Sequence, residues 1–309
     1  MQLFFAPVQG HTDAAYRSFH SKIYKGNLSY FTPFLRLEKN NLRPRDLKDL
    51  NSDLNKNIHL VPQIIFRDED ELKQLSDLLI KQGRDEIDLN LGCPFPLQTG
   101  HGRGAAAISN KNVALALKNL VIQNPEVKFS VKMRLGLNDP DEWQNLLPIL
   151  NQIKLERIVL HPRIAKQQYG GEPDLERFKE FYKNSKNPVI YNGDITTPTD
   201  FKNVKEMFPG IHGVMIGRGL LGRPSLAIEI LNQEEWAKEE RIKVMLEFHN
   251  ELYSYYSSVL CGNSQVISKI QPFWEYAEAE IGRKAWKAIK KASSIPKYQT
   301  AVAMIQNSL

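Results

Sequence analysis

The stretch Ile87-Asp88-Leu89-Asn90-Leu91-Gly92-Cys93-Pro94 joins an apolar strand pattern directly to a tight turn. Glycine and proline on either side of Cys93 favour that turn and place the thiol at the carboxyl end of the strand. The chain has 309 residues and only one other cysteine, Cys261, which excludes a disulfide framework and a four-cysteine metal site. Cys93 therefore serves either packing or chemistry.

Short apolar runs on both sides of this stretch alternate with helical patterns, which is typical of βαβ units and a parallel sheet. Eight such runs in this order predict a (β/α)8 TIM barrel. The predicted strands lie near residues 3–5, 28–31, 59–65, 86–90, 128–133, 157–160, 188–191 and 213–216.

Helical patterns fill the intervals between the strands. Asp139-Pro140 and Thr197-Pro198 predict two helix starts, because proline fits the first helical turn. Residues 34–56 are charged and aperiodic, which predicts a long loop with a short helix. The predicted helices cover 14–24, 69–82, 110–123, 141–152, 173–183 and 198–207.

The pattern changes near residue 235, after which strand signals stop and amphipathic helices follow one another. We therefore place a domain boundary at 232–236. The prediction is an α/β TIM-barrel catalytic domain at 1–233 and an all-helical domain at 234–309.

Composition is ordinary for a soluble globular protein, with 42% hydrophobic and 25% charged residues. Residues 1–7 have no basic segment and no long apolar run, so we expect neither a secretory signal nor a membrane span. Two unpaired cysteines agree with a reducing cytoplasm, and we expect a monomer there. The net charge of +6 favours a polyanionic partner such as nucleic acid, although many basic proteins bind none.

Chemistry in TIM barrels gathers at the carboxyl ends of the strands, where the loops converge on one face. Polar residues follow almost every predicted strand at that end, so the sequence predicts a site there. These residues are Gln9, Gln63, Asn90, Cys93, Lys132, Arg134, His161, Arg163, Asn192, Asp194 and Arg218.

Two glycine-containing segments follow the last two strands, Tyr191-Asn192-Gly193-Asp194 and Met215-Ile216-Gly217-Arg218-Gly219. Glycine lets backbone N–H groups approach a phosphate, and an arginine adds a charge-assisted bond. An isolated Gly-Arg-Gly would more often be a tight turn only. Its pairing with the neighbouring loop predicts a phosphate site instead.

Lys132 lies on a strand with apolar flanks, and a buried ammonium requires an anionic or electron-rich partner. The alternative is a lysine at a strand end, in solvent. His161 has no second histidine or carboxylate at metal spacing, so we expect no catalytic metal. Cys93 can be a general acid, because a thiol is mainly protonated at neutral pH. Two other interpretations of Cys93 are that it acts as a nucleophile, or that it is only a small buried side chain.

Taken together, these residues resemble the tRNA-dihydrouridine synthases, flavoenzymes that reduce a uridine in folded tRNA. The resemblance runs from Ala6-Pro7-Val8-Gln9-Gly10-His11-Thr12-Asp13 to Gly217-Arg218-Gly219, with separated motifs in the family's order, and continues weakly into the helical tail. It implies FMN over the barrel mouth and NADPH as reductant. The positions that match the family's FMN site are Pro7, Val8, Gln9, Gln63, Lys132, His161, Asn192, Gly193, Asp194, Gly217 and Arg218.

The resemblance also implies a mechanism. FMN N5 would give a hydride to C6 of uracil, and Cys93 would supply a proton to C5 from the other side of the base. Lys132 would stabilise negative charge on the reduced flavin.

A uridine inside a folded RNA must turn out of its stack to reach such a site, so contacts elsewhere must offset the cost. Residues 283–297 carry six cations and no acid, and on a helix residues 283, 287, 290 and 291 share one face. A charge run can be a solvated face only, but beside this barrel it predicts contact with the RNA backbone. With the positions implied by the family pattern, the predicted RNA-binding residues are Arg36, Asn90, Tyr169, Lys269, Arg283, Lys287 and Lys291.

Two segments depart from the family's pattern. Tyr30-Phe31-Thr32-Pro33-Phe34 lacks the common acidic residue after the threonine, and Phe95-Pro96-Leu97-Gln98 stands where a lysine often follows Cys-Pro. Competing interpretations are a flavoenzyme that acts on a free pyrimidine, a ribosomal RNA dihydrouridine synthase, and an RNA-binding protein that has lost catalysis. The first of these needs no basic helical tail.

Overall fold

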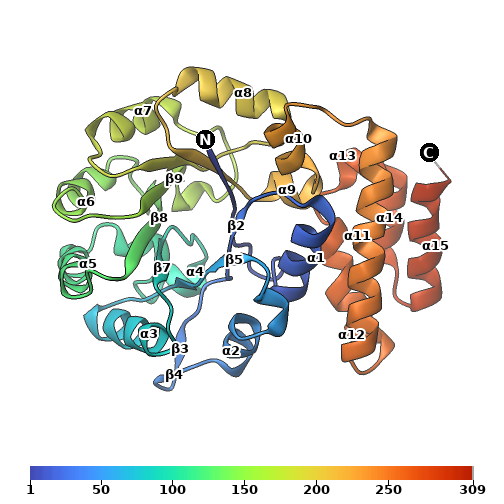
Figure 1. Cartoon of the computed structure of the whole chain (residues 1–309), viewed down its shortest axis with the longest axis horizontal. Coiled ribbons are helices and arrows are strands. Elements are labelled where there is room, and N and C mark those ends of the chain that lie inside the picture. Colours follow the sequence, from blue (N-terminus) through green and yellow to red (C-terminus); the bar gives the residue numbers. More distant parts are fainter. Residues whose placement is uncertain (308–309) are drawn as a thin grey trace.

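The computed structural model describes residues 1–307 and shows a ring of strands with helices around it and further helices to one side (Figure 1). The strands of the ring are β1 (Gln2–Phe5), β2 (Ser29–Phe31), β5 (His59–Val61), β6 (Gln63–Ile64), β7 (Glu86–Leu91), β8 (Lys128–Gly136), β9 (Arg157–Ile164), β10 (Val189–Tyr191) and β11 (Gly213–Ile216). They form a sheet of nine strands in the order β5-β2-β1-β11-β10-β9-β8-β7-β6, and all of its pairs are parallel. The predicted TIM-barrel fold class is confirmed.

The ninth strand arises because the third predicted strand, at 59–65, is divided into β5 and β6. Pro62 lies between them and has no N–H group to give to a sheet. β5 pairs with β2, and β6 pairs with β7, so this one segment joins the two edges of the sheet and nearly closes the ring. The other seven predicted strands are present, and β8 and β9 extend further toward their carboxyl ends than predicted.

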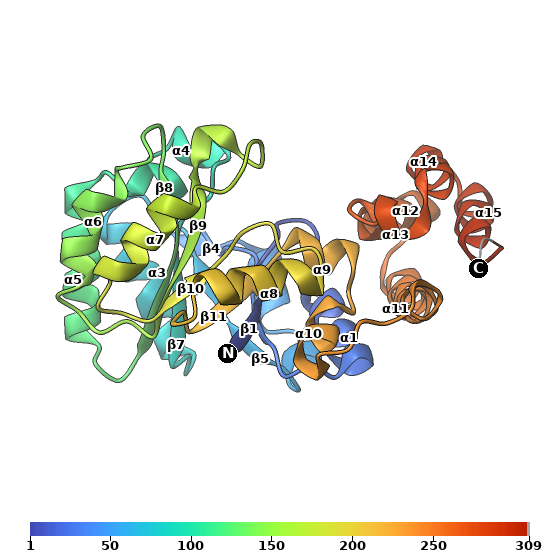
Figure 2. The same cartoon turned by 90° about the horizontal axis from the view of Figure 1, so that it is seen from above.

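Helices alternate with the strands and cover the outside of the ring (Figures 1 and 2). α1 (Ala14–Tyr24) and α8 (Pro198–Met207) have the predicted bounds. As the Thr197-Pro198 pattern predicts, Thr197 caps α8, and its hydroxyl accepts a hydrogen bond from Asp200 N at 3.1 Å. The other helices around the ring are α3 (Glu69–Lys81), α5 (Lys111–Gln123), α6 (Trp143–Leu150) and α7 (Leu175–Asn184), with a 3-10 turn, η3 (Ala165–Gln167), after β9.

The predicted helix start at Asp139-Pro140 is wrong, because α6 begins at Trp143. The Glu142 carboxylate accepts hydrogen bonds from three backbone N–H groups, those of Leu137, Asn138 and Asp139, at 2.9, 3.0 and 2.9 Å. Those bonds hold the residues before the helix in a tight turn instead of a helical one.

Residues 34–56 contain more structure than the predicted loop with a short helix. A hairpin of two-residue strands, β3 (Leu37–Glu38) and β4 (Asn41–Leu42), precedes α2 (Pro44–Leu50) and the 3-10 turn η1 (Asp53–Asn55). Lys39 and Asn40 both have positive φ, 50° and 64°, as the turn of a two-residue hairpin requires. Strands this short carry no periodicity, so the sequence pattern could not reveal them.

A separate apolar cluster fills the interior of the ring. Side chains alternate along a strand, so Phe4 and Ala6 face inward while Leu3 and Phe5 pack against the helices. At the amino end, the Arg157 guanidinium lies 4.9 Å from the centre of the Phe4 ring. The interior cluster consists of Phe4, Ala6, Phe31, Val61, Val159, Ile190 and Met215.

After β11 the described chain is helical. α9 (Arg218–Gly222) and α10 (Leu226–Asn232) still lie against the ring, and the segments that follow are α11 (Lys238–Val259), α12 (Asn263–Ile270), the 3-10 turn η4 (Gln271–Trp274), α13 (Glu278–Ile281), α14 (Arg283–Lys291) and α15 (Ile295–Gln306). They stand beside the barrel (Figures 1 and 2). The predicted domain division at 233/234 falls between α10 and α11 and stays a prediction. Within residues 1–307, every helix is too short or too polar to cross a membrane.

Asp13 joins the two parts of the chain. Its carboxylate caps α1 by accepting a hydrogen bond from Tyr16 N at 2.9 Å. The same carboxylate accepts a hydrogen bond from the Tyr256 hydroxyl at 3.0 Å and lies 2.6 Å from the Lys269 ammonium. The loop after β1 is therefore fastened directly to the C-terminal helices.

Candidate active site

A cavity of about 580 Å³ opens at the carboxyl ends of the strands, and Cys93, Lys132 and His161 all line it. A second cavity of about 390 Å³ adjoins it. Figure 2 shows that α4 (Pro96–Thr99), which follows Cys93, and the N-terminus lie on opposite sides of the barrel. The residues that line both cavities are Pro7, Val8, Lys132, His161, Tyr169 and Tyr276.

The structure brings all the residues of the predicted cofactor site to these two cavities. Those in the larger cavity are Pro7, Val8, Gln9, Gln63, Lys132 and His161. Those that the smaller cavity adds are Asn192, Gly193, Asp194, Gly217 and Arg218. Together they form one elongated space that runs from the Cys93 turn to the loops after the last two strands.

Local hydrogen bonds hold the Cys93 turn in place. The Asn90 side-chain oxygen accepts from the backbone N–H groups of Gly92 and Cys93 at 3.0 and 2.9 Å. Gly104 closes the turn from the other side with a φ of +63°, and a Cβ there would lie 2.6 Å from the Cys93 carbonyl oxygen. Only glycine fits at 104, and the thiol is therefore presented from a fixed backbone.

A chain of hydrogen bonds leads from this turn into the barrel. Asn90 Nδ2 donates to Gln63 Oε1 at 2.7 Å, and Gln63 Nε2 donates to Asp88 Oδ2 at 2.7 Å. The Ser130 hydroxyl donates to the other Asp88 oxygen at 2.6 Å. Both Asp88 oxygens accept, so Asp88 fixes the orientation of the Gln63 amide, which in turn fixes that of Asn90.

Burial and neighbouring charges alter the titration of the groups in the larger cavity. Burial, helped by the Arg134 charge, lowers the pKa of Lys132 to about 8, against the opposing effect of Asp88. Burial also raises the pKa of the Cys93 thiol, although Arg134 and Lys132 oppose the shift. The thiol is therefore held in its protonated form at neutral pH.

His161 is neutral in this setting. Burial, followed by the charges of Arg134 and Lys132, holds its pKa well below the usual value of a histidine. Arg163 Nη1 lies 3.1 Å from His161 Nε2, and since a guanidinium only donates, the proton of the neutral ring lies on Nδ1. That leaves His161 with one donor to offer to a ligand.

The smaller cavity is organised around Asp194. Its carboxylate accepts hydrogen bonds from Arg163 at 2.5 and 3.0 Å and from Arg218 at 2.7 Å. A carboxylate repels a phosphate, so the side chain of Asp194 positions Arg218. The Arg218 guanidinium lies 4.3 Å from the centre of the Tyr169 ring, which fixes it from the other side.

Glycine is required beside this group at residue 193. A Cβ at Gly193 would lie 2.1 Å from the Tyr191 hydroxyl, so a larger residue would displace that side chain. Gly193 therefore leaves the Tyr191 side chain in its packed position.

Among the residues in or beneath the site to which the sequence assigned no role are Asp88, Arg134 and Tyr276. Asp88 belongs to an apolar strand pattern, and its pairing with Gln63 depends on the register between β6 and β7. Arg134 was noted at a strand end; its side chain donates to the carbonyl oxygens of Gly92 and Ile164, at 3.1 and 3.0 Å. Tyr276 lies far along the chain in the helical tail, where no pattern links it to the barrel.

The residues predicted to bind RNA lie in three places. Arg36, Asn90 and Tyr169 line the larger cavity. Lys269 lies where the helices meet the barrel, with its ammonium paired to Asp13. Those on α14 are Arg283, Lys287 and Lys291.

The exposed cations of α14 form one face, which we call the α14 surface. Ala285 and Ile289 are buried on the opposite side of the helix. Within residues 1–307, Lys287 and Lys291 have no acidic partner within ion-pair distance. The α14 surface consists of Arg283, Lys284, Lys287, Lys290 and Lys291.

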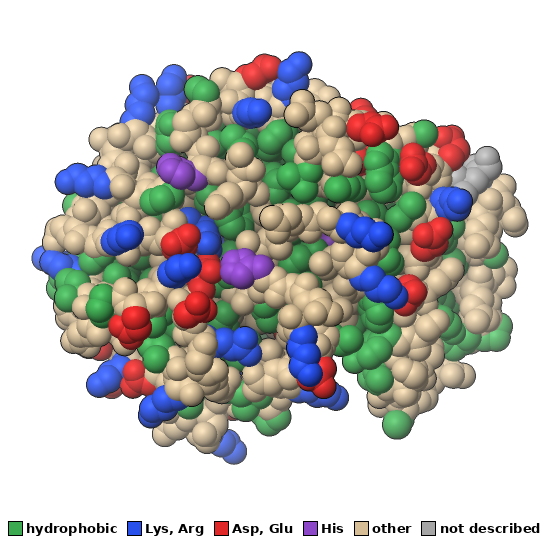
Figure 3. Space-filling model, in the orientation of Figure 1, with side chains coloured by type: hydrophobic (Ala, Val, Ile, Leu, Met, Phe, Trp, Pro, Cys, Tyr) green, Lys and Arg blue, Asp and Glu red, His purple; other side chains and the backbone are tan. Residues whose placement is uncertain are grey.

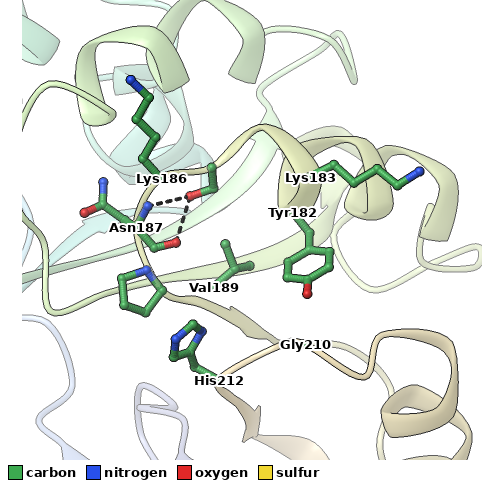
Figure 4. Close-up of a pocket in the computed structure, with 9 residues that line it drawn as sticks. Tyr182, Lys183, Lys186, Asn187, Val189, Gly210 and His212 are labelled. Carbon is green, nitrogen blue, oxygen red and sulfur yellow. Dashed lines mark hydrogen bonds between the residues drawn. The ribbon is translucent and has the colours of Figure 1, made fainter.

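The other parts of the surface that we describe next show no comparable cluster of reactive or like-charged side chains. On the face shown in Figure 3, lysine and arginine side chains are interspersed with acidic ones. A hollow at the amino end of β10 lies between Tyr182, Lys186 and His212 (Figure 4). There the Ser185 hydroxyl only fastens its own turn, through bonds to the Asn187 backbone at 3.0 and 3.2 Å. In residues 1–307, no group of three or more His, Cys, Asp or Glu side chains is placed to hold a metal ion.

Comparison with solved structures gives the same architecture. Histamine dehydrogenase from Rhizobium sp. 4-9 superposes with a TM-score of 0.52 at 12% identity, over 85% of this chain and 50% of that one. Morphinone reductase in complex with tetrahydroNAD superposes with a TM-score of 0.52 at 11% identity, over 76% of this chain and 88% of that one. These identities show a likeness of fold alone.

Sequence comparison shows the family. tRNA-dihydrouridine synthase B of Pasteurella multocida is 26% identical over 268 residues, 82% of this chain and 78% of that protein. The probable tRNA-dihydrouridine synthase of Rickettsia bellii is 30% identical over 184 residues, 56% of each protein. Several relatives are spanned over only 55 to 63% of their length. A family model described as dihydrouridine synthase (Dus) matches residues 4–306, and the protein therefore belongs to the dihydrouridine synthase family of flavin-dependent oxidoreductases.

Proposed function

We propose that the protein reduces a specific uridine of tRNA to 5,6-dihydrouridine, with FMN as its cofactor and NADPH as the reductant. The observation that carries the proposal is that Cys93 and Lys132 line one cavity, and that this cavity continues into the space beside Gly217 and Arg218. An acid thus lies in the larger cavity, a cation where the two cavities meet, and an arginine in the smaller one. A cytoplasmic location is part of the same proposal.

The chain's own residues fit FMN. Lys132 is half-buried and forms no hydrogen bond or ion pair with the other residues of 1–307, and an ammonium that loses solvation without gaining a partner is costly. A flavin ring system in the larger cavity would provide the missing electron-rich partner. In the smaller cavity, Gly193 and Gly217 leave backbone exposed and Arg218 adds a charge, which suits a phosphate.

Cys93 is the residue that we assign as proton donor. When bound, FMN would supply the hydride that the reaction adds to C6 of uracil, and NADPH would restore the cofactor. The remaining proton goes to C5, and Cys93 is suited to give it because burial favours the protonated thiol. The rigid turn around the thiol keeps it directed into the cavity.

Asn90 is suited to orient the uracil. Its side-chain oxygen and one of its amide hydrogens are already used by Cys93, Gly92 and Gln63. The second amide hydrogen has no partner within residues 1–307 and can be donated to a uracil carbonyl. The adjacent thiol would then face the carbon atoms of the same ring.

Binding of tRNA must offset the cost of turning the uridine out of its stack. The α14 surface provides exposed cations for the RNA backbone, and Arg36 and Tyr169 lie at the cavity for the nucleotides near the target. Lys269 adds its charge only if the RNA competes with Asp13.

Mapping of dihydrouridine in total RNA from cells with and without the gene tests the proposal. We expect loss of the modification at a defined tRNA uridine, and restoration by the wild-type gene. Loss at a ribosomal RNA position instead would correct the substrate. An unchanged map in tRNA and ribosomal RNA, combined with reduction of a free pyrimidine by the purified protein, would refute the proposal.

A further inference from the structure

Phe95 and Leu97 are apolar side chains that the structure leaves in solvent at the rim of the active-site cavity. Their exposed fractions are 60% and 69%, yet both line the cavity that contains Cys93. Single exposed apolar residues are common on protein surfaces. Two on one short segment, directly after the proposed proton donor, form a local apolar surface instead.

Backbone hydrogen bonds order the segment that carries these side chains. Phe95 precedes α4, and its carbonyl oxygen accepts from Gln98 N and Thr99 N at 2.8 and 3.0 Å. On the other side of the turn, Ala105 N donates to the Cys93 carbonyl oxygen at 3.1 Å. Phe95 is therefore exposed on an ordered turn.

Positive charge lines the same cavity, on the segment that follows β2. Arg36 and Arg45 both line it, and Arg45 is largely exposed, 3.8 Å from the nearest Asp46 oxygen. The Arg43 guanidinium is less available to a ligand, because its Nε donates a hydrogen bond to the Asp46 carboxylate at 2.6 Å. Arg36 Nε is buried and has no hydrogen-bond partner in the structure. The cavity thus combines an apolar surface with guanidinium groups that lack full partners.

We propose that Phe95 and Leu97 form a stacking platform for an unpaired nucleobase next to the target uridine, with its phosphate held by Arg36 and Arg45. An aromatic ring stacks on any base, and apolar side chains inserted at a base step keep it open. The guanidinium groups match a phosphate, which an apolar protein partner would lack. The platform rests on the proposed function, and it would hold the RNA open while the uridine occupies the cavity.

The test compares Phe95→Ala, Phe95→Trp and a matched control, Ile122→Ala, in the full-length flavin-loaded protein. Ile122 is 58% exposed, on α5, and lines neither cavity of the site. The probe is tRNA isolated from cells that lack the gene. We expect Phe95→Ala to raise both Kd and KM about tenfold, which corresponds to about 1.4 kcal/mol, while Phe95→Trp and Ile122→Ala remain close to wild type.

Wild-type values of Kd and KM for Phe95→Ala would overturn the platform. So would a change confined to self-association in sedimentation, which would make the apolar surface a contact between copies of the chain. If the wild-type protein reduces no uridine in this tRNA, the proposed function fails, and the Kd comparison still decides the platform. Equal melting temperatures of Phe95→Ala and Ile122→Ala would show that the effect does not arise from unfolding.

Discussion

The barrel mouth and the α14 surface carry positive charge in opposite ways. At the mouth, burial lowers the pKa of Lys132 to about 8 and that of Arg134 to about 10. On α14 the cations are exposed, and Lys287 and Lys291 lack acidic partners within residues 1–307. A buried cation acts on one bound group at short range, whereas exposed cations act together on a polyanion and are screened by salt.

This difference predicts two kinds of mutational effect. Changes at the mouth should alter one step strongly, because the side chains there line a single cavity and act on one bound group at short range. Changes on the α14 surface should alter binding gradually, because no single cation there is held by a partner network. The predictions below are ordered from the largest expected effect to the smallest.

Removal of the Cys93 thiol should have the largest effect. We expect Cys93→Ala to retain its flavin and its tRNA affinity but to lose turnover by about 10² to 10⁴-fold, the range typical of a lost general acid. Single-turnover kinetics would measure the loss. Cys261→Ala is the control, since Cys261 is exposed and outside the cavity. Wild-type turnover by Cys93→Ala would show that another group donates the proton.

Replacement of Asp88 should affect both stability and the position of the thiol. Asp88→Leu leaves the donors of Gln63 and Ser130 without an acceptor, which should lower the free energy of unfolding by about 3 kcal/mol. Asp88→Asn keeps one acceptor oxygen for Gln63, and its free energy of unfolding should fall much less. Denaturant unfolding would measure both. Equal losses for the two variants would contradict the role assigned to this hydrogen-bond chain.

The sequence was sufficient to predict which residues meet at the mouth, because parallel strands bring their carboxyl ends to one face. The sequence was insufficient to predict the hydrogen bonds between the side chains that lie beneath the mouth. The contact between Gln63 and Asp88 depends on the division of the third strand at Pro62, which sets the register with β7. Tyr276 reaches the mouth only through the docking of the C-terminal helices, and no local pattern encodes such a contact.

Charge reversal on the α14 surface should have a moderate effect. Lys287→Glu combined with Lys291→Glu should weaken tRNA binding and reduce the slope of log Kd against log salt by about 1 to 2. Binding titrations at several salt concentrations would measure the slope. The matched control is Lys73→Glu with Lys81→Glu, two exposed lysines on α3. An unchanged slope, or an equal change in the control, would remove this surface from the RNA interface.

Acid should weaken the C-terminal helices through His249, an effect that is absent at pH 7 and grows only as the pH falls below 6.5. Burial lowers the pKa of His249 to about 4, and its Nε2 lies 2.7 Å from the Tyr298 hydroxyl. Between pH 6.5 and about 4 the unfolded chain binds a proton that the folded chain does not, so stability falls as pH falls through this window.

A non-titrating variant isolates that contribution. His249→Gln should lower the free energy of unfolding at pH 7 but should make it less dependent on pH between 6.5 and 4, by at most about 1.4 kcal/mol per pH unit. Unfolding followed by tryptophan fluorescence suits the measurement, because Trp274 Nε1 also donates to the Tyr298 hydroxyl, at 2.9 Å. Identical pH slopes for the two proteins would assign the acid sensitivity to other groups, of which His20, buried between the barrel and the helices with its pKa lowered to about 4, is the first to examine.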